Sequence, residues 1–204
     1  MKLNRQEVAR YLGAGDASFS PAVEELVGSC EAELFSTVTP RYLSRRVTLA
    51  TLPFASADLA RHLRHCREVF LMAVTLGAAC DQLLRRWSVS HMGRAALGQA
   101  CAAAWMDDCC DQYCAILEGG LAPGEFLLPP YSPGYGDFSL SYQGELLQRL
   151  DAGRRLGVSL TAGGMLVPEK TVTAIVGISH EKTERCVQKC MRCQKSDCVF
   201  RKGT

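Results

Sequence analysis

A short loop carries residue types that suit the binding of a small ligand. It reads Tyr131-Ser132-Pro133-Gly134-Tyr135-Gly136-Asp137. Pro133 fixes its own φ and biases Ser132 toward an extended conformation. Gly134 and Gly136 can adopt positive φ and lack a Cβ, so backbone N–H groups can approach a ligand closely. With two tyrosine rings beside them, these residues suit a ligand that has an aromatic ring and a carboxylate. On composition alone, a tight turn that binds nothing is the more common outcome.

Four cysteines close to the C-terminus have a spacing that favours a metal centre. They are Cys186, Cys190, Cys193 and Cys198. The surrounding Lys and Arg residues favour the thiolate, which is the form that binds metal. The compact Cys-x3-Cys-x2-Cys-x4-Cys spacing favours a 4Fe–4S cluster over a zinc ribbon, in which a longer loop separates two cysteine pairs. Zinc is the alternative metal, and a reduced tail without metal is the third possibility.

The composition indicates an ordinary globular chain. It has 204 residues, 48% of them hydrophobic, and a net charge of +2, which gives no reason to expect nucleic acid as a partner. No signal peptide is expected at the polar segment Met1–Leu12, and no apolar run reaches the about 18 residues that span a membrane. A cytoplasmic location follows as an expectation. The cysteines outside the tail occur in apolar contexts typical of buried thiols in a reducing compartment: Cys30, Cys66, Cys80, Cys101, Cys109, Cys110 and Cys114.

Capping signals and hydrophobic periodicity predict the elements of the first half of the chain. Asn4 and Ser20 can each cap a helix, and Pro21 suits a first helical position. The predicted helices are 5–13, 21–36, Ala57–Cys66 and Gly77–Trp87. The predicted strands are Arg41–Leu52 and Glu68–Leu76, the second of them buried.

The longest helical pattern, Ser90–Glu118, is predicted to be the central helix. Its middle part, Ala95–Ala104, consists almost entirely of small residues, which let a neighbouring element approach closely. A short strand, Glu125–Leu128, leads into the loop, and an amphipathic helix, Leu140–Leu150, follows it. Val158–Ile178 predicts two or three strands. Because strands and helices do not alternate regularly, we predict one α+β domain, 1–178, with a mostly antiparallel twisted sheet, followed by a Cys-rich tail, 179–204.

The loop and the segments after it resemble the activation domain of cobalamin-dependent methionine synthase, in a short stand-alone form. The resemblance rests on Tyr131–Asp137 with Phe138-Ser139-Leu140 and Gln143 behind it, on Leu156–Thr161, and on Met165–Thr173. These segments occur in the order that the family shows, over roughly the last two thirds of the chain up to Ile178. The resemblance implies the same α+β fold.

The resemblance also implies a ligand and its site. That family binds S-adenosylmethionine and presents it to cob(II)alamin, which one electron and one methyl group return to methylcobalamin. The implied binding residues are Ser132, Pro133, Gly134, Tyr135 and Gly136. An acidic residue on the long helix is implied as the partner of the ligand's amine, and Asp107 matches it best by register, with Asp108 next. Where the family has an Arg that contacts the ligand's carboxylate, this chain has Pro130.

The function implied is that of a reactivation factor that is inactive by itself. It would support reductive methylation of cobalamin on a separate corrinoid protein or methionine synthase module, with flavodoxin or ferredoxin as the low-potential electron donor. The chain has no Asp-x-His-x-x-Gly motif, so any cobalamin is expected to come from the partner. His62, His65, His91 and His180 are expected to be surface histidines rather than ligands. Because Pro130 replaces the Arg, the alternative is a non-catalytic corrinoid-protein partner or iron–sulfur redox adaptor that has lost S-adenosylmethionine binding.

Overall fold

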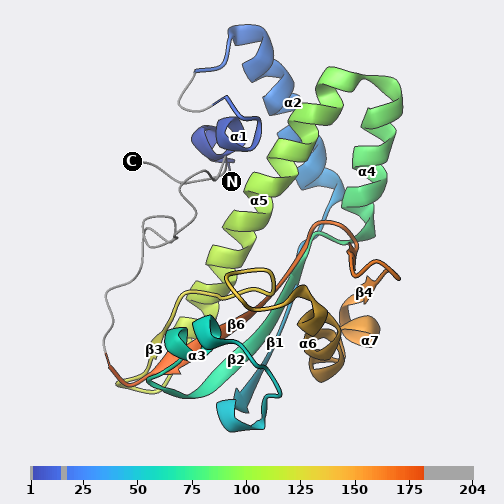
Figure 1. The fold of residues 1–204 in the computed structure, drawn as a ribbon. Coiled ribbons are helices and arrows are strands. Elements are labelled where there is room, and N and C mark those ends of the chain that lie inside the picture. Colours follow the sequence, from blue (N-terminus) through green and yellow to red (C-terminus); the bar gives the residue numbers. More distant parts are fainter. Residues whose placement is uncertain (1, 15–17, 182–204) are drawn as a thin grey trace.

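The computed structural model describes residues 2–14 and 18–181 (Figure 1). Its α-helices are α1 (Arg5–Tyr11), α2 (Pro21–Thr37), α3 (Ala57–His62), α4 (Gly77–Ser90), α5 (Met92–Gly119), α6 (Gln143–Leu150) and α7 (Ala152–Leu156). Its strands are β1 (Arg41–Thr48), β2 (Cys66–Thr75), β3 (Phe126–Leu127), β4 (Ser159–Leu160), β5 (Leu166–Val167) and β6 (Thr171–Ser179). Two short 3-10 helices, η1 (Leu49–Thr51) and η2 (Leu140–Tyr142), complete the described elements.

The main sheet has four strands in the order β1-β2-β6-β3, and all neighbouring strands are antiparallel. The two long central strands, β2 and β6, pair along most of their length, with Leu71 opposite Ile175. β4 and β5 form a separate two-stranded hairpin. This arrangement confirms the predicted α+β fold with a mostly antiparallel sheet.

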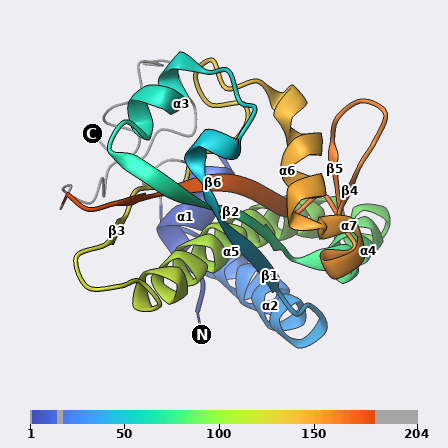
Figure 2. The same cartoon turned by 90° about the horizontal axis from the view of Figure 1, so that it is seen from below.

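Helices cover both faces of the sheet (Figure 2). Side chains alternate along a strand, so each central strand contributes to two cores. Met72 and Val74 of β2 belong to the core under α1, α2, α4 and α5, whereas Leu71 and Ala73 belong to the core that contains residues of α3, α6 and α7. This double burial explains why β2 reads as a continuous apolar run rather than as an alternating one.

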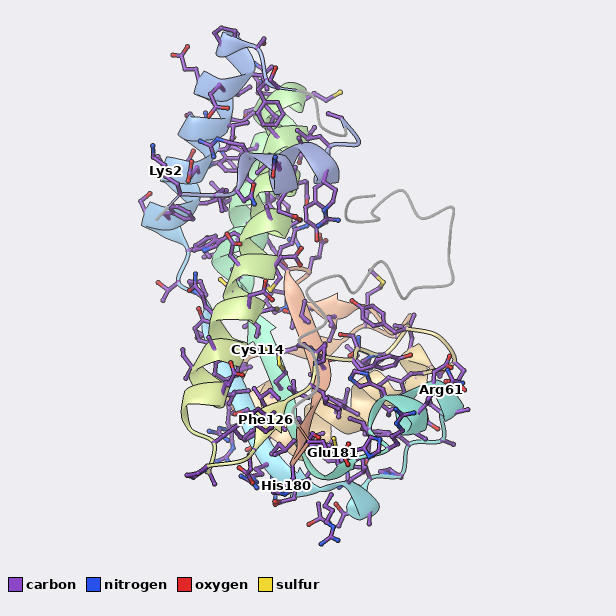
Figure 3. All side chains as sticks on the ribbon, turned by 90° about the vertical axis from the view of Figure 1, so that its left-hand side faces the viewer. Lys2, Arg61, Cys114, Phe126, His180 and Glu181 are labelled. Carbon is purple, nitrogen blue, oxygen red and sulfur yellow. The ribbon has the colours of Figure 1, made fainter. Side chains whose placement is uncertain are left out.

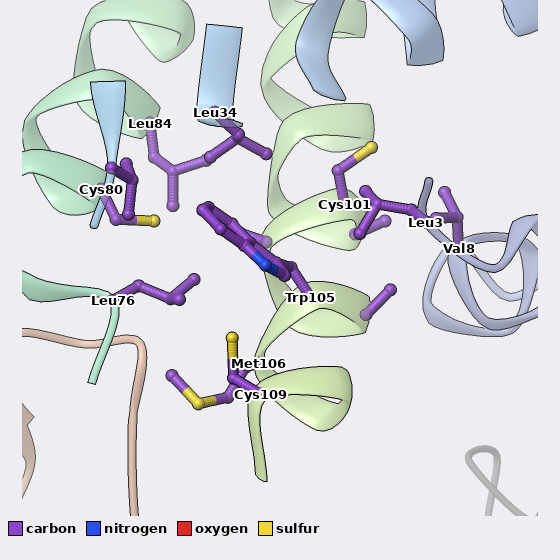
Figure 4. Packing of buried hydrophobic residues seen from close by; sticks show 14 of the residues in the cluster. Leu3, Val8, Leu34, Leu76, Cys80, Leu84, Cys101, Trp105, Met106 and Cys109 are labelled. Carbon is purple, nitrogen blue, oxygen red and sulfur yellow. The ribbon is translucent and has the colours of Figure 1, made fainter. Parts of the chain in front are cut away.

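Helix α5 is the central helix, as predicted. Its N-terminal half packs against α1, α2 and α4, and its C-terminal half reaches the sheet (Figure 1). The Trp105 side chain projects from α5 toward Leu34, Leu76 and Leu84 (Figure 4), and its ring meets Phe35 edge-on at 4.7 Å between centroids. At Gly98 the absence of a side chain lets α4 approach closely, as predicted, because a Cβ there would lie 2.3 Å from the Trp87 ring. The α4–α5 seam therefore requires glycine there.

The predicted caps are confirmed. The Asn4 side chain accepts a hydrogen bond from the Gln6 N–H at 3.0 Å, and Ser20 accepts one from the Val23 N–H at 3.4 Å. Helix α3 ends earlier than predicted, because β2 already begins at Cys66. Among the cysteines of the described residues, Cys110 and Cys114 are half-buried and the others are buried.

The chain leaves the sheet close to the predicted domain end. β6 continues to Ser179, so the boundary at 178 coincides with the last strand, but the tail itself falls on residues 182–204, outside the described part. The division into a domain and a metal-binding tail therefore stays a prediction. Within residues 2–14 and 18–181, none of the helices combines the length and the apolarity that a bilayer crossing requires.

Candidate functional site

The predicted loop leaves the sheet at the outer side of β6. After β3 the chain continues along β6, with the Leu128 N–H donating to the Gly177 carbonyl at 2.9 Å. Tyr131 and Ile175 then exchange both backbone hydrogen bonds, at 2.8 and 2.9 Å. The loop therefore starts from a central strand of the sheet, because β6 pairs with β2 on its other side.

The loop is a compact turn built around its glycines. Gly134 and Gly136 have φ of +96° and +51°, as the sequence predicts. The Gly134 N–H donates to the Phe138 carbonyl at 2.6 Å, and the Phe138 N–H donates to the Tyr135 carbonyl at 2.9 Å. A Cβ on Gly136 would lie 2.3 Å from the Asp58 carboxylate, so a larger residue cannot occupy this position without displacing its neighbours.

Most backbone donors of the loop are used within the protein. The N–H groups of Gly134, Tyr135 and Phe138 bond to loop carbonyls, and that of Asp137 bonds to Asp58. The N–H groups of Ser132 and Gly136 have no acceptor among the described residues. Backbone donation to a ligand, which the sequence predicts in general terms, is therefore available at these two positions.

An aromatic cluster lies behind the loop and presents one ring to solvent. Phe138 is buried and stacks on Tyr142, with ring centroids 5.4 Å apart. Tyr131 contacts Phe138 on one side and meets Tyr135 edge-on at 5.6 Å on the other. Tyr135 is 53% exposed, and the neighbouring Leu140 is 60% exposed. The site is therefore an open apolar surface, supported by buried and half-buried aromatic side chains, rather than a closed pocket.

Helix α3 contributes polar groups that the sequence did not identify. The Asp137 carboxylate accepts hydrogen bonds from the Ser56 hydroxyl and from the N–H groups of Ala57, at 2.8 Å, and Asp58, at 3.1 Å. In return, Asp58 accepts from the Asp137 N–H at 3.2 Å. The bond from Ser56, with those from the backbone, holds the pKa of Asp137 below its usual value.

His62 corrects a prediction, because it is not a surface histidine. Its Nε2 lies 2.9 Å from the Pro129 carbonyl, and its ring lies 5.1 Å from that of Tyr131. A carbonyl only accepts, so Nε2 carries the proton. Burial lowers the pKa of His62, and the bond to Pro129 offsets this in part. The prediction for His62 was wrong because α3 packs against a loop that lies far away along the chain. The other three, His65, His91 and His180, are exposed, as predicted.

Asp107, the predicted partner of the ligand's amine, lies on α5 beside α1. Its carboxylate accepts from the Tyr11 hydroxyl at 2.8 Å and from Arg10 at 3.1 Å. Burial, and then the charge of Asp107, raises the pKa of Tyr11 to about 12. No contact joins Asp107 to the loop among the described residues, where the acidic groups beside the loop are Asp58 and Asp137. A role for Asp107 toward a ligand stays a prediction.

The sheet lies between α5, which carries Asp107, and α3 with the loop. Seen from the β3 side, Cys114 on α5 lies to one side of the sheet and Arg61 on α3 to the other (Figure 3). An open cleft of about 360 Å³ lies elsewhere, between α6, α7 and β4, and takes none of its lining from 131–137. The cleft therefore does not coincide with the loop.

The predicted metal ligands cannot be placed. Cys186, Cys190, Cys193 and Cys198 all lie outside the described residues. Within residues 2–14 and 18–181, no group of three or more His, Cys, Asp or Glu side chains could hold a metal ion. The 4Fe–4S cluster and its zinc alternative both stay predictions that concern the tail alone.

Comparisons with known proteins bear on the fold. No protein-family model matches the chain, and no curated protein matches it. Among solved structures, the chain is similar to the crystal structure of the MetH reactivation domain bound to AdoHcy, with a TM-score of 0.56 and 14% sequence identity. The likeness covers 90% of this chain and 77% of that one. At this identity the likeness concerns the arrangement of the elements, and it agrees with the resemblance seen in the sequence. The chain therefore has the fold of the MetH reactivation domain.

Proposed function

We propose that the chain binds S-adenosylmethionine at the Ser132–Gly136 loop and so supports reductive methylation of cobalamin on a separate corrinoid protein or methionine synthase module. The observation that carries the proposal is the turn itself, in which positive φ at Gly134 and Gly136 presents the exposed Tyr135 ring. A structure of similar fold is described as bound to AdoHcy, which is S-adenosylmethionine without its methyl group. This likeness supports the choice of ligand.

The chemical groups at the loop fit the parts of that ligand. The exposed face of Tyr135 would suit the adenine ring, and the N–H groups of Ser132 and Gly136 would donate to the carboxylate. Asp58 accepts a hydrogen bond from the Asp137 N–H at the end of the loop, and its side chain is 34% exposed. Asp58 is therefore a further candidate for the partner of the ligand's amine. Two backbone donors are a weaker clamp than a guanidinium fork, so we expect weak to moderate affinity.

The chain would contribute mainly proximity. Holding the sulfonium methyl group beside the partner's cobalt makes the encounter effectively unimolecular. No acid–base residue is required for this transfer, which agrees with a site whose described side chains are mostly aromatic. The electron would come from flavodoxin or ferredoxin. The tail cysteines Cys186, Cys190, Cys193 and Cys198 would hold a 4Fe–4S cluster, or else zinc, which cannot relay electrons.

Calorimetric titration with S-adenosylmethionine and S-adenosylhomocysteine tests the proposal. Tyr135→Ala should weaken binding by about tenfold or more, the effect of losing about 1.4 kcal/mol of ring contact. Ser141→Ala, just outside the loop on η2, is the matched control and should leave the affinity unchanged. If the unaltered protein gives no heat and no thermal shift with millimolar ligand, the proposal is wrong.

The second candidate is a non-catalytic corrinoid-protein partner or iron–sulfur redox adaptor. The observation in its favour is Pro130, because the loop has no cationic side chain and the nearby Arg61 is paired with Asp58 at 2.8 Å. Pro130→Arg separates the two candidates. If the loop binds the ligand's carboxylate, the new guanidinium should strengthen binding by about 1.5–3 kcal/mol, the range for a hydrogen bond to a charged group. No gain from Pro130→Arg, together with no binding by the original chain, favours the adaptor.

A further inference from the structure

One helix, α3, forms hydrogen bonds at both ends of the Tyr131–Asp137 loop. Asp137, at the end of the loop, bonds to the first residues of α3, and Pro129, before the loop, bonds to His62 at the last residue of α3. We propose that Asp137 and His62 are positioning residues, which set the Tyr135 ring and the N–H groups of Ser132 and Gly136 for the ligand. This inference rests on the proposed function for the identity of the ligand.

The Asp137 end is a two-way connection. Its carboxylate accepts from the Ser56 hydroxyl and from the N–H groups of Ala57 and Asp58, while its own N–H donates to the Asp58 carboxylate at 3.2 Å. Ser56 in turn accepts from the Leu59 N–H at 2.9 Å, so helix and loop share one cap. Gly136, one of the two loop residues whose N–H has no acceptor among the described residues, directly precedes Asp137. The bonds that Asp137 makes to α3 therefore restrict the backbone next to that N–H.

At the Pro129 end, successive ring contacts connect His62 to the exposed Tyr135. The His62 ring lies 5.1 Å from Tyr131, and Tyr131 lies 5.6 Å from Tyr135. His62 also fixes the carbonyl of Pro129 at 2.9 Å, three residues before Ser132. A change at His62 would therefore move both the entrance of the loop and the ring that supports Tyr135.

These contacts are peripheral to the core, which separates positioning from stability. Helix α3 is already anchored by Leu59 and by Leu63 just after it, which are 4% and 1% exposed within the core on that face of the sheet. Asp137 is an exposed residue, and His62 is half-buried. Removing either side chain should loosen the loop while α3 stays in place.

The test combines hydrogen exchange, thermal unfolding and calorimetry on Asp137→Ala and His62→Ala. In each variant, the N–H groups of Gly134 and Phe138 should exchange about tenfold faster or more, because the turn opens locally. The Kd for S-adenosylhomocysteine should rise by about tenfold, while Tm changes little. Asp111→Ala, an exposed residue of α5, and His65→Ala, an exposed histidine, are matched controls and should change neither quantity. Asp137→Asn keeps one acceptor oxygen and should lie between the unaltered protein and Asp137→Ala.

Three other results would overturn the proposal. Exchange and affinity unchanged in both alanine variants would show that α3 does not hold the loop. Faster exchange without a change in Kd would show that the held geometry does not matter to the ligand. A loss of Tm in step with the loss of affinity, also in the milder Asp137→Asn variant, would indicate a purely structural role. If the unaltered protein binds no ligand, the proposed function fails, and the exchange data alone still decide whether α3 holds the loop.

Discussion

At the scale of single residues, His62 shows how much a neighbour can change the meaning of a side chain. Alone in the sequence it reads as an exposed histidine. In the structure it is half-buried, donates to Pro129 and packs on Tyr131. No residue close to it in sequence signals this, because the partners lie on the loop and its approach. Gly134 and Gly136 are the opposite case, since their positive φ follows from residue type and local order alone.

His62 also gives the protein a pH-dependent term in its stability. Its pKa in the folded chain lies below the ordinary 6.5 because burial disfavours the charged form. The unfolded state therefore takes up the proton more readily, so the free energy of unfolding should fall as the pH drops from above 6.5 toward the folded pKa. In His62→Gln the amide can still donate to Pro129 but does not titrate. Urea unfolding at pH 7.5 and 5.5 should show a smaller pH effect in His62→Gln than in the unaltered protein. An equal pH effect in both proteins would contradict the assignment.

At the scale of elements, local signals predicted most of the helices and strands, and long-range packing supplied the rest. Caps at Asn4 and Ser20 and the apolar run of β2 were sufficient to predict those elements. The bonds between Asp137 and Ser56 join positions 81 residues apart. Nothing in either segment indicates the other, so the loop could be predicted but not the helix that holds it. Asp107 illustrates the same limit, because register along α5 does not reveal that Arg10 and Tyr11 of α1 bond to its carboxylate.

The seam between α4 and α5 allows a sharp test of element packing. Gly98→Ala places a Cβ 2.3 Å from the ring of Trp87, a buried and bulky neighbour that cannot easily move. We expect it to destabilise the fold by about 1–3 kcal/mol, the usual cost of overpacking. Gly28→Ala on α2 is the matched control, because nothing lies within 4 Å of its Cβ. It should stabilise the protein by about 0.5–1 kcal/mol through helix propensity. Chemical denaturation measures both, and equal effects of the two changes would contradict the packing argument.

At the scale of the whole molecule, the proposed function requires other proteins. The sequence has no Asp-x-His-x-x-Gly motif for binding a corrinoid. We therefore expect the purified chain to catalyse no methyl transfer with S-adenosylmethionine alone. It should accelerate methylation of cob(II)alamin only when a corrinoid protein and a low-potential electron donor are both present. Methyl transfer from S-adenosylmethionine by the chain without any corrinoid would refute this and indicate an ordinary methyltransferase. Tyr135→Ala should abolish most of the partner-dependent rate.

The tail can be tested without knowing its structure. Protein purified without oxygen should contain iron and sulfide if Cys186, Cys190, Cys193 and Cys198 hold a 4Fe–4S cluster. A Cys190→Ser/Cys193→Ser double variant should lose both elements, and a Cys30→Ser variant, which removes a buried core thiol, should retain them. One zinc without iron would keep the metal site and exclude electron transfer through it. Protein free of metal under these conditions would contradict both assignments.

The order of the sheet also bears on how the protein behaves at high concentration. Strand β1 forms one edge of the sheet, and an eight-residue edge strand is a template on which other chains can add. Arg41 and Arg45 extend from this edge and donate to the carbonyls of Leu156 and Arg149, so the guanidinium groups connect it to α6 and α7. Charge and bulk at the edge oppose strand-to-strand addition between copies. We therefore expect Arg41 and Arg45 to hinder the pairing of β1 with a strand of another copy of this protein.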